Sequence, residues 1–266
     1  MDLSVIIPVY NSEKIINNLV DQIIDSIKNI HTINSYEIIL INDCSPDSSW
    51  EKIKLLSKKY SVVKGISLAE NFGQHNAIMA GLKECSGEKI ITMDDDLQHP
   101  PQSIKNLVDE LDKNFDVSYT KYLNRQHPFW KKIVSWLNNL VSSFLLNKPY
   151  HIYLSSFRAF KKNIAKEILN YEGSSIYLDS LILKATRNIS IIPVEHKERP
   201  HGFSNYSFRK LLLLWSDMIV DLKIYPVRFS SIFIITILPF IIIIRKILFS
   251  RKKNKKKLYV IKVKTE

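Results

Sequence analysis

Three aspartates in a row, Asp94, Asp95 and Asp96, directly follow the apolar run Lys89–Met93. Such a run is typical of a buried strand, so the carboxylates are expected at its carboxyl end. Side chains two residues apart share one face of a strand, which predicts that Asp94 and Asp96 converge while Asp95 points away. Two converging carboxylates repel each other unless a cation lies between them. The spacing therefore predicts a site for Mg²⁺ or Mn²⁺, with Gln98 as a further oxygen ligand.

The acidic cluster could also be a solvated turn before Pro100. Polar groups at the ends of other expected strands argue against that reading. Tyr10 follows the apolar run of residues 3–9, and Asp43 follows the run of residues 36–41. An aromatic ring can stack on a nucleotide base, and a carboxylate can accept hydrogen bonds from the base. Asp43 could equally cap the next turn.

A third strand end carries a glycine. Gly73 lies in the run Asn71–Asn76, after the strand expected over residues 62–67 and before a helix expected from Gln74. A glycine lets the backbone approach a ligand closely, and a helix N-terminus attracts phosphate. Open α/β sheets bind ligands at the carboxyl ends of their strands. These strand ends could therefore hold one nucleotide diphosphate and one metal ion together.

The elements that must position these residues alternate along the chain. Four strand–helix repeats predict an α/β fold with a Rossmann-like, mostly parallel sheet flanked by helices. Further strands are expected over residues 115–120, 153–160 and 189–194, the second followed by a helix to about residue 170. The expected repeats are strands over 3–9, 36–41, 62–67 and 89–93, and helices over 15–28, 48–59, 74–84 and 101–113.

Composition limits the partners. The chain has 266 residues, 45% of them hydrophobic, and a formal net charge of +12. Such a charge favours nucleic acid, anionic lipid or a phosphorylated substrate. Much of the excess lies in the basic cluster of residues 251–257, so nucleic acid is not the expected ligand. Cys44 and Cys85 fit no metal-ligand spacing and indicate a reducing cytosol, and the strand pattern directly after Asp2 argues against a signal peptide.

The C-terminal half contains segments suited to a membrane. Residues 129–146 and 207–225 have broad apolar faces with aromatic residues, typical of helices in a membrane interface, although core-facing helices show the same pattern. Residues 229–244 carry no charge. Snorkelling of the two basic residues that follow would extend this stretch to residue 249, enough for one span. A soluble core helix is the alternative, but the basic cluster that follows favours a membrane segment with a cytosolic flank.

Four motifs together resemble the polyprenyl-phosphate glycosyltransferases. They follow the order and spacing of that family within residues 3–228, and they are Pro8–Asn11, Asn42–Asp47, Asn71–Gly81 and Asp94–Pro101. The family is the dolichol-phosphate mannose synthase-like branch of the inverting, GT-A-fold glycosyltransferase family 2, and the likeness is to its bacterial undecaprenyl-phosphate aminoarabinose and glucose transferases. The resemblance implies inverting transfer of a sugar from a nucleotide-sugar, UDP-linked in these relatives, to a polyprenyl phosphate, for modification of a cell-envelope glycan.

The resemblance also implies two groups of ligands. Asp94, Asp96 and Gln98 would hold Mg²⁺ or Mn²⁺. Residues 199–206 resemble the segment that closes over the nucleotide diphosphate, but Asn205 stands where the family usually has lysine, so one cation is missing unless its neighbours compensate. The residues implied in nucleotide-sugar binding are Pro8, Tyr10, Glu13, Asp43, Asn71, Gly73, Gln74, Asp94, Arg199, Ser204 and Tyr206.

A further element points to the acceptor. Ser155–Arg158 resembles the Ser-Gly-Phe-Arg element of the family, which implies that Ser155 and Arg158 contact the acceptor phosphate. An arginine suits this role because its guanidinium binds phosphate through two parallel hydrogen bonds. A surface salt bridge is the alternative for Arg158. Arg125 and Lys131 are plausible helpers, and the catalytic residues implied are Asp96, Ser155 and Arg158.

The implied organisation ends at the membrane. We expect a catalytic domain over residues 1–206, an amphipathic juxtamembrane helix over 207–228, a membrane segment over 229–249 and a basic cytosolic tail over 250–266. The bacterial relatives usually have two spans, whereas the apolar length here suffices for one. One full span would place the basic cluster outside, against the positive-inside tendency. We therefore expect a re-entrant or interfacial segment at the cytoplasmic face of the inner cell membrane. The sequence leaves open whether the protein forms a homo-oligomer.

Two other functions stay open at the level of sequence. A glycosyltransferase that acts on a saccharide hydroxyl would need a carboxylate base, for which Asp179 is the obvious candidate. A non-catalytic binding protein is the second, although Asp94, Asp96 and Gln98 argue against it. Strand alternation further predicts that Asp95→Ala spares much of the activity, while Asp96→Ala abolishes it.

Overall fold

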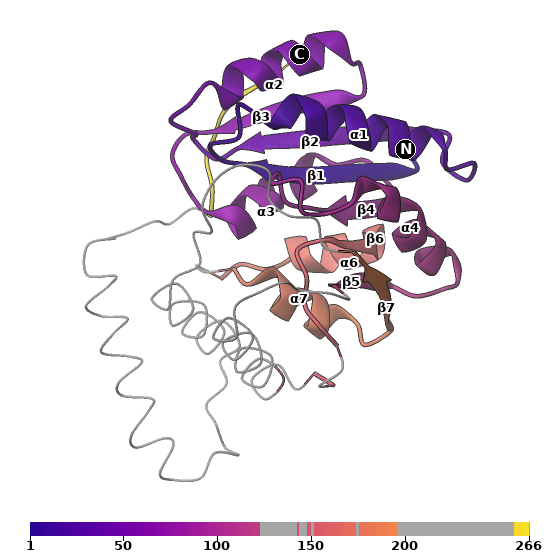
Figure 1. The fold of residues 1–266 in the computed structure, drawn as a ribbon. Coiled ribbons are helices and arrows are strands. Elements are labelled where there is room, and N and C mark those ends of the chain that lie inside the picture. The colour runs from indigo at the N-terminus through magenta and orange to yellow at the C-terminus, as the bar shows by residue number, and fades with distance from the viewer. Residues whose placement is uncertain (123–142, 144–147, 150–151, 174–175, 196–257, 266) are drawn as a thin grey trace, which may run out of the picture.

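The computed structural model describes residues 1–122, 143, 148–149, 152–173, 176–195 and 258–265. These residues form one eight-stranded sheet with helices on both faces (Figure 1). The strand order is β7-β5-β6-β4-β1-β2-β3-β8. The strands are β1 (Leu3–Val9), β2 (Tyr36–Asn42), β3 (Val63–Leu68), β4 (Lys89–Thr92), β5 (Val117–Tyr122), β6 (Arg158–Lys161), β7 (Ile189–Val194) and β8 (Ile261–Lys264).

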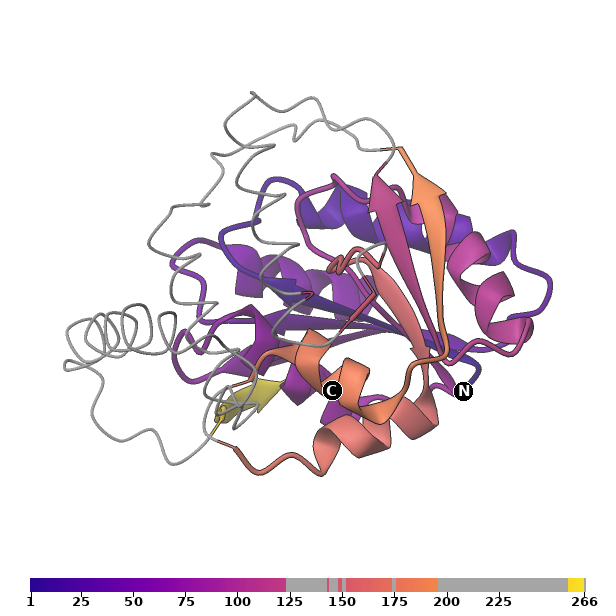
Figure 2. The same cartoon turned by 90° about the horizontal axis from the view of Figure 1, so that it is seen from below.

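Two layers of helices cover the sheet, as the view from below shows (Figure 2). Helices α1, α2 and α4 share one core with Val5 and Ile7, whereas α3, α6 and α7 share the other with Ile6. Successive residues of β1 thus enter opposite cores, which explains why Val5, Ile6 and Ile7 are all apolar. The helices are α1 (Ile16–Lys28), α2 (Ser49–Lys59), α3 (Gln74–Glu84), the 3₁₀ turn η1 (Pro101–Ser103), α4 (Ile104–Asp112), α6 (Lys162–Leu169) and α7 (Leu178–Ala185).

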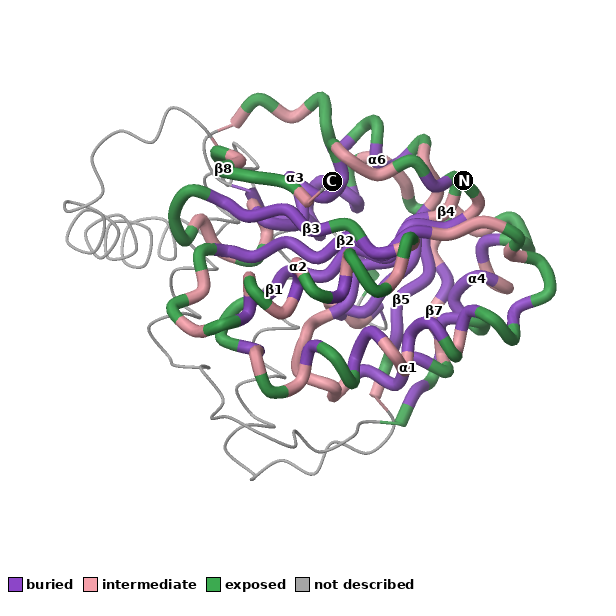
Figure 3. Tube along the Cα trace, turned by 90° about the horizontal axis from the view of Figure 1, so that it is seen from above, coloured by how far each residue is buried: buried purple, intermediate pink, exposed green. Residues whose placement is uncertain are grey.

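Burial follows the period of each element. The central strands are buried along their length, while the helices are buried on one side and exposed on the other (Figure 3). α1 is the clearest case, because its apolar residues recur at helical spacing and leave polar residues for the solvent side. Its buried residues are Ile16, Leu19, Val20, Ile23, Ile24 and Ile27.

The strand directions bring many loops to one rim. β1 is parallel to β2 and β4, and β2 is parallel to β3, so these strands end together. We call this edge the carboxyl rim: the residues that follow Val9, Asn42, Leu68 and Thr92. β6 and β8 run antiparallel to β4 and β3 and therefore begin at this rim. β5 is antiparallel to β6 and parallel to β7, so β5 and β7 end there as well.

Most of the expected elements are confirmed, and α3 and β7 have the predicted bounds. Two expectations need correction, and two further elements have no counterpart among the predictions. Residues 153–160 form a strand only from Arg158, because Ser155 and Ser156 turn their hydroxyls to Thr120 and Asp94 instead of extending the ladder. α7 and β8 were not expected. β4 ends at Thr92, so strand alternation does not extend to the three aspartates.

No helix among the described residues is both long and apolar enough to cross a bilayer. The expected amphipathic helices over 129–146 and 207–228 and the expected membrane segment over 229–249 lie outside those residues, apart from Ser143. The division of the chain at residues 206, 228 and 249 therefore stays a prediction.

Candidate active site

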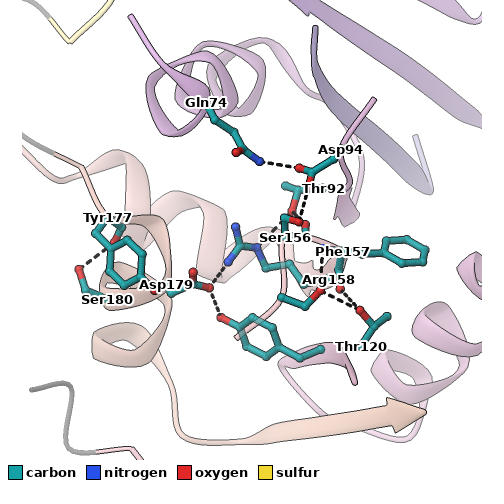
Figure 4. A network of polar contacts seen from close by, with 12 residues as sticks. Gln74, Thr92, Asp94, Thr120, Ser156, Phe157, Arg158, Tyr177, Asp179 and Ser180 are labelled. Carbon is teal, nitrogen blue, oxygen red and sulfur yellow. Dashed lines mark hydrogen bonds and ion pairs between the residues drawn. The ribbon is translucent and has the colours of Figure 1, made fainter. Parts of the chain in front are cut away.

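Asp94 lies at the centre of the carboxyl rim and joins three segments of the chain (Figure 4). Gln74, the first residue of α3, donates from Nε2 to one carboxylate oxygen of Asp94 at 2.5 Å. Ser156, just before β6, donates from Oγ to the other oxygen at 2.7 Å. The backbone N–H of Asp94 donates to Nδ1 of the buried His99 at 3.1 Å. The structure thus brings the predicted residues Asp94 and Gln74 into contact.

A buried charge pair lies behind Asp94. Arg158 is 1% exposed, and its guanidinium contacts the carboxylate of Asp179 in the first turn of α7. Tyr119 of β5 donates to the same carboxylate at 2.8 Å. Burial by itself would lower the pKa of Arg158, but the charges and hydrogen bonds of Asp179 and Tyr119 together outweigh burial and raise that pKa, so the guanidinium stays protonated.

Thr92 connects this charge pair to the rim. Its hydroxyl accepts a hydrogen bond from Nε of Arg158 at 3.2 Å and donates to the backbone carbonyl of Ser156 at 2.9 Å. Ser156 in turn donates to Asp94, so a continuous polar chain runs from Asp94 to Asp179 (Figure 4). Arg158 is therefore neither an exposed phosphate ligand in this structure nor part of the surface salt bridge considered as its alternative.

Asp43 holds the glycine loop that precedes α3. Its two carboxylate oxygens accept the backbone N–H groups of Phe72 and Gly73 at 2.7 and 2.8 Å. Gly73 has φ +89° and nothing within 4 Å of where a Cβ would lie. The conformation therefore favours glycine, and the open space allows a ligand to approach the backbone closely. Asp43 therefore caps the glycine loop rather than only the turn that directly follows it, and its contact with a base stays a prediction.

The loop between β1 and α1 is fixed to its neighbours by several hydrogen bonds. Glu13 accepts from the backbone N–H of Ser48 at 3.0 Å, and its own N–H donates to Asp47 at 3.0 Å. Asp95 accepts from the backbone N–H of Tyr10 and from the hydroxyl of Ser12. Burial raises the pKa of Asp95 to about 6, against the effect of these two donors. The Tyr10 side chain stays 47% exposed, where a ring could stack on a base.

Asp96 and Gln98 form a turn after β4. The backbone N–H of Gln98 donates to Oδ1 of Asp96 at 3.0 Å, and Leu97 between them has φ +61°. Within the described part of the chain, no three His, Cys, Asp or Glu side chains are arranged to hold a metal ion. Mg²⁺ rarely needs such a cage, because one or two carboxylates, water and substrate phosphates complete its shell. Asp94, Asp96 and Gln98 are therefore a suitable oxygen set only together with a diphosphate.

The remaining predicted residues divide into two groups. Pro8 pairs with Ile41 inside the sheet, Asn71 is exposed beside Phe72, and Ser155 is buried with its hydroxyl on Thr120. Sequence reasoning missed the partners of the rim residues, because no motif contains Thr92 or Tyr119 and the motif that contains His99 assigns it no role. The predicted residues Arg125, Lys131, Arg199, Ser204 and Tyr206 lie outside the described residues.

A mostly parallel α/β sheet with carboxylates and a glycine loop at the carboxyl ends of its strands is the arrangement of a nucleotide-binding α/β protein. The chain matches the family model for glycosyl transferase family 2 over residues 4–169. It is 36% identical over 231 residues to the undecaprenyl-phosphate 4-deoxy-4-formamido-L-arabinose transferase of Salmonella choleraesuis, covering 86% of this chain and 70% of that protein. The corresponding enzyme of Proteus mirabilis is 35% identical over 234 residues, with the same coverage. The chain belongs to glycosyl transferase family 2 and is a glycosyltransferase.

Solved structures share the fold at low identity. Staphylococcus aureus TarS in complex with UDP-GlcNAc matches with a TM-score of 0.54 and 21% identity, covering 96% of this chain and 77% of that one. Glucosyl-3-phosphoglycerate synthase of Mycobacterium tuberculosis, in complex with Mn²⁺, UDP-glucose and phosphoglyceric acid, matches with a TM-score of 0.61 and 14% identity, covering 85% and 81%. The fold is thus like that of GT-A enzymes, as the family resemblance implied.

Proposed function

We propose that this enzyme transfers one sugar from a nucleotide-sugar, UDP-linked as in the structural neighbours, to the phosphate of a polyprenyl phosphate. The curated relatives at 35–36% identity are named as undecaprenyl-phosphate transferases, which supports undecaprenyl phosphate as the acceptor. The acceptor phosphate oxygen attacks the anomeric carbon and the nucleoside diphosphate leaves, with inversion. A phosphate monoester is already anionic near neutral pH, so this reaction needs no strong base.

One observation carries the proposal: every long excursion of the chain from the sheet starts or ends at the carboxyl rim. The chain leaves the sheet there after Tyr122 and after Val194, and it returns there before Arg158 and before Ile261. The two excursions contain the amphipathic stretches and the uncharged run of residues 229–244. A lipid-linked acceptor and a rim rich in carboxylates would thereby meet at one edge of the domain.

The residues of the rim suit distinct roles. Tyr10 is exposed enough to stack on the base, and the open backbone at Gly73 suits the diphosphate. Asp94 and Asp96, with Gln98, would hold Mg²⁺ or Mn²⁺ together with that diphosphate. Bound there, the cation would neutralise charge on the leaving group. Asp94 is held in place by Gln74 and Ser156, which pre-orients it.

Arg158 would act from behind the rim. Its charge is buried and largely neutralised by Asp179, so it acts mainly by holding Thr92 and Ser156, and through them Asp94, in place. Arg125, Lys131 and Ser155 stay candidates for direct contact with the acceptor phosphate. Arg199, Ser204 and Tyr206 stay candidates for closing over the donor.

The contacts that Asp179 makes with Arg158 and Tyr119 favour a phosphate acceptor over a saccharide hydroxyl. A hydroxyl nucleophile needs a carboxylate free to take its proton. Asp179 is 6% exposed, and one of its oxygens contacts Arg158 and also accepts from Tyr119. A buried carboxylate oxygen that is already occupied by an arginine and a tyrosine is not free to contact an acceptor hydroxyl. The reading in which Asp179 serves as base is therefore the weaker one.

β8 bears on how the chain meets the membrane. Residues 229–249 lie between β7 at one edge of the sheet and β8 at the other, and both strands belong to the same sheet. A single crossing would separate β8 from β3 by a bilayer. We therefore propose that this segment enters and leaves on the cytoplasmic face, as a re-entrant or interfacial element of the inner membrane.

The test is transfer by the full chain in lipid vesicles. UDP-sugars with a radiolabelled sugar are mixed with undecaprenyl phosphate, and label in the organic phase is counted with Mg²⁺ or Mn²⁺ present. We expect label in the organic phase that depends on undecaprenyl phosphate and is lost in Asp96→Ala. A parallel donor screen by mass spectrometry of the lipid product identifies the sugar.

The outcomes separate the alternatives. Label transferred only to water-soluble saccharides would favour the hydroxyl acceptor and overturn the proposal. Nucleotide binding without transfer or hydrolysis for any donor would favour a non-catalytic relative. Transfer with GDP-sugars alone would support polyprenyl phosphate as the acceptor and replace the UDP-sugar by a GDP-sugar as the proposed donor.

A further inference from the structure

Asp95 binds two donors of one loop through a single oxygen. The backbone N–H of Tyr10 donates to Oδ2 of Asp95 at 3.0 Å, and the hydroxyl of Ser12 donates to the same Oδ2. Asp95 follows β4, whereas Tyr10 and Ser12 follow β1, so this contact joins the ends of two adjacent strands. Asp94, by contrast, binds Gln74 and Ser156 and does not share these partners.

The loop that Asp95 holds has an unusual conformation. Asn11, between the two donors, has φ +60°, the left-handed region that costs an L-residue free energy. Ser12 is 4% exposed, its N–H donates to Ser49 at 2.9 Å, and its carbonyl accepts from Ile16 at 3.1 Å as α1 begins. Each of these contacts points inward, so the loop presents the exposed Tyr10 ring outward.

We propose that Asp95 is a positioning residue that locks the nucleotide-binding loop, residues 10–12, onto the end of β4. This inference rests on the proposed function, because the ligand of the loop is the donor base. A base that stacks on Tyr10 needs a ring whose backbone is fixed, since ordering a mobile loop on binding weakens affinity. Asp95 thus acts on donor binding through the loop and touches neither the metal nor the sugar.

The geometry separates this role from that of a metal ligand. Both donors converge on one oxygen, so an asparagine with its amide oxygen at that position can still accept from Tyr10 and Ser12. A metal ligand loses its charge in the same substitution. Asp95→Asn is therefore expected to keep the lock, whereas Asp95→Ala removes it. Ser12→Ala removes one of the two donors and leaves the other.

The experiment compares Asp95→Ala, Asp95→Asn and Ser12→Ala in the full chain in lipid vesicles. Asp112→Ala is the matched control, because Asp112 pairs with Lys89 at the opposite end of β4. Steady-state transfer gives KM for the UDP-sugar and kcat, and hydrogen exchange gives the protection of the Tyr10 amide. We expect Asp95→Ala to raise the donor KM about 10-fold with kcat within about 3-fold, as lost hydrogen bonds of this kind imply.

The variants are expected to fall in a fixed order. Ser12→Ala raises the donor KM less than Asp95→Ala, and Asp95→Asn and Asp112→Ala stay near the wild type. The amide of Tyr10 loses protection in Asp95→Ala alone among the aspartate variants. An unchanged donor KM and unchanged protection in Asp95→Ala would overturn the lock, and so would an Asp95→Asn variant as impaired as Asp95→Ala.

The exchange measurement keeps this inference distinct from the proposed function. If the wild type binds no UDP-sugar, the function fails, yet the loss of Tyr10 protection in Asp95→Ala would still support the lock. If transfer occurs and protection does not change, the lock fails while the function stands.

Discussion

Arg158 of β6 and Asp179 of α7 form a buried ion pair directly behind the carboxyl rim. The pair is joined to Asp94 through Thr92 and Ser156. Asp94 is therefore held by hydrogen bonds to a buried ion pair and not by solvent alone. A buried charge is costly unless it is paired and hydrogen-bonded, and Tyr119 supplies a further bond to the carboxylate. This arrangement gives the inner side of the site its rigidity, while the pair itself is net neutral.

Removing one partner of this pair should be more harmful than removing both. Asp179→Ala leaves the Arg158 charge buried without a counterion and should lower the free energy of unfolding by about 3–5 kcal/mol. The double substitution Arg158→Met with Asp179→Leu should recover at least about 1 kcal/mol of that loss, because no unpaired charge is left. Chemical denaturation in detergent, followed by intrinsic fluorescence, measures both changes.

The control is Asp112→Ala. The ion pair between Asp112 and Lys89 is partly exposed and should contribute about 0–1 kcal/mol to the free energy of unfolding. Equal losses in Asp179→Ala and Asp112→Ala would contradict the burial argument. A double variant less stable than Asp179→Ala would contradict the pairing of Arg158 with Asp179.

Asp43 should respond to amide substitution differently from Asp95. Its two oxygens each accept one backbone N–H, from Phe72 and from Gly73. Asp43→Asn turns an NH₂ group toward one of these N–H donors, so one hydrogen bond is lost and about 1–3 kcal/mol of stability with it. The glycine loop should then exchange its amide protons faster, as hydrogen exchange detects. Asp43→Asn with wild-type protection at Phe72 and Gly73 would contradict this account.

The sequence predicts the rim well because the rim depends on local patterns. Apolar runs mark the ends of β1, β2 and β4, and strand–helix alternation makes these strands parallel, which brings Asp43, Asp94 and Gly73 to one edge. The partners behind the rim depend on distant contacts instead. Tyr119 and Asp179 are 60 residues apart, and nothing in the local sequence of either indicates the other.

Two errors have a shared physical cause. The prediction extends the alternation of strand faces through Asp94–Asp96, but β4 ends at Thr92. The Asp95 side chain therefore contacts Ser12 instead of pointing away from the site. β8 has a short sequence flanked by lysines and looks like a solvated tail. Its pairing with β3 includes the contact between Gly65 and Thr265, 200 residues apart. In both cases tertiary contacts decide where the backbone turns or pairs, and a local pattern cannot reveal them.

Acid should weaken the fold through His75. In an unfolded chain a histidine takes up its proton near pH 6.5, but burial lowers the pKa of His75 to about 4. Between these values the unfolded state binds more protons, so the free energy of unfolding falls as the pH drops from 6.5 toward 4. His75→Gln removes this contribution. Denaturation midpoints at pH 7.5 and pH 5 should therefore differ less in His75→Gln than in the wild type; an equal or larger difference would contradict the assignment.

Removal of the divalent metal should abolish sugar transfer reversibly. Chelation is expected to reduce the rate at least about 100-fold, because charge stabilisation by a metal is worth several kcal/mol, and added Mg²⁺ or Mn²⁺ should restore it. Asp96→Ala should show the same loss without recovery, with an unfolding midpoint close to that of the wild type. Full activity in chelator would contradict the role given to Asp94, Asp96 and Gln98.

β8 allows the membrane arrangement to be tested with two thiols. Cys44 is exposed at the rim and reports on the catalytic domain, while Lys262 is exposed on β8. Two single-thiol proteins are compared, one with Cys85→Ser alone and one with Lys262→Cys added to Cys44→Ser and Cys85→Ser. Because β8 pairs with β3, an impermeant maleimide should label both from the same face of sealed vesicles. Labelling from opposite faces would mean that residues 196–257 cross the bilayer an odd number of times, which the β3–β8 pairing does not permit.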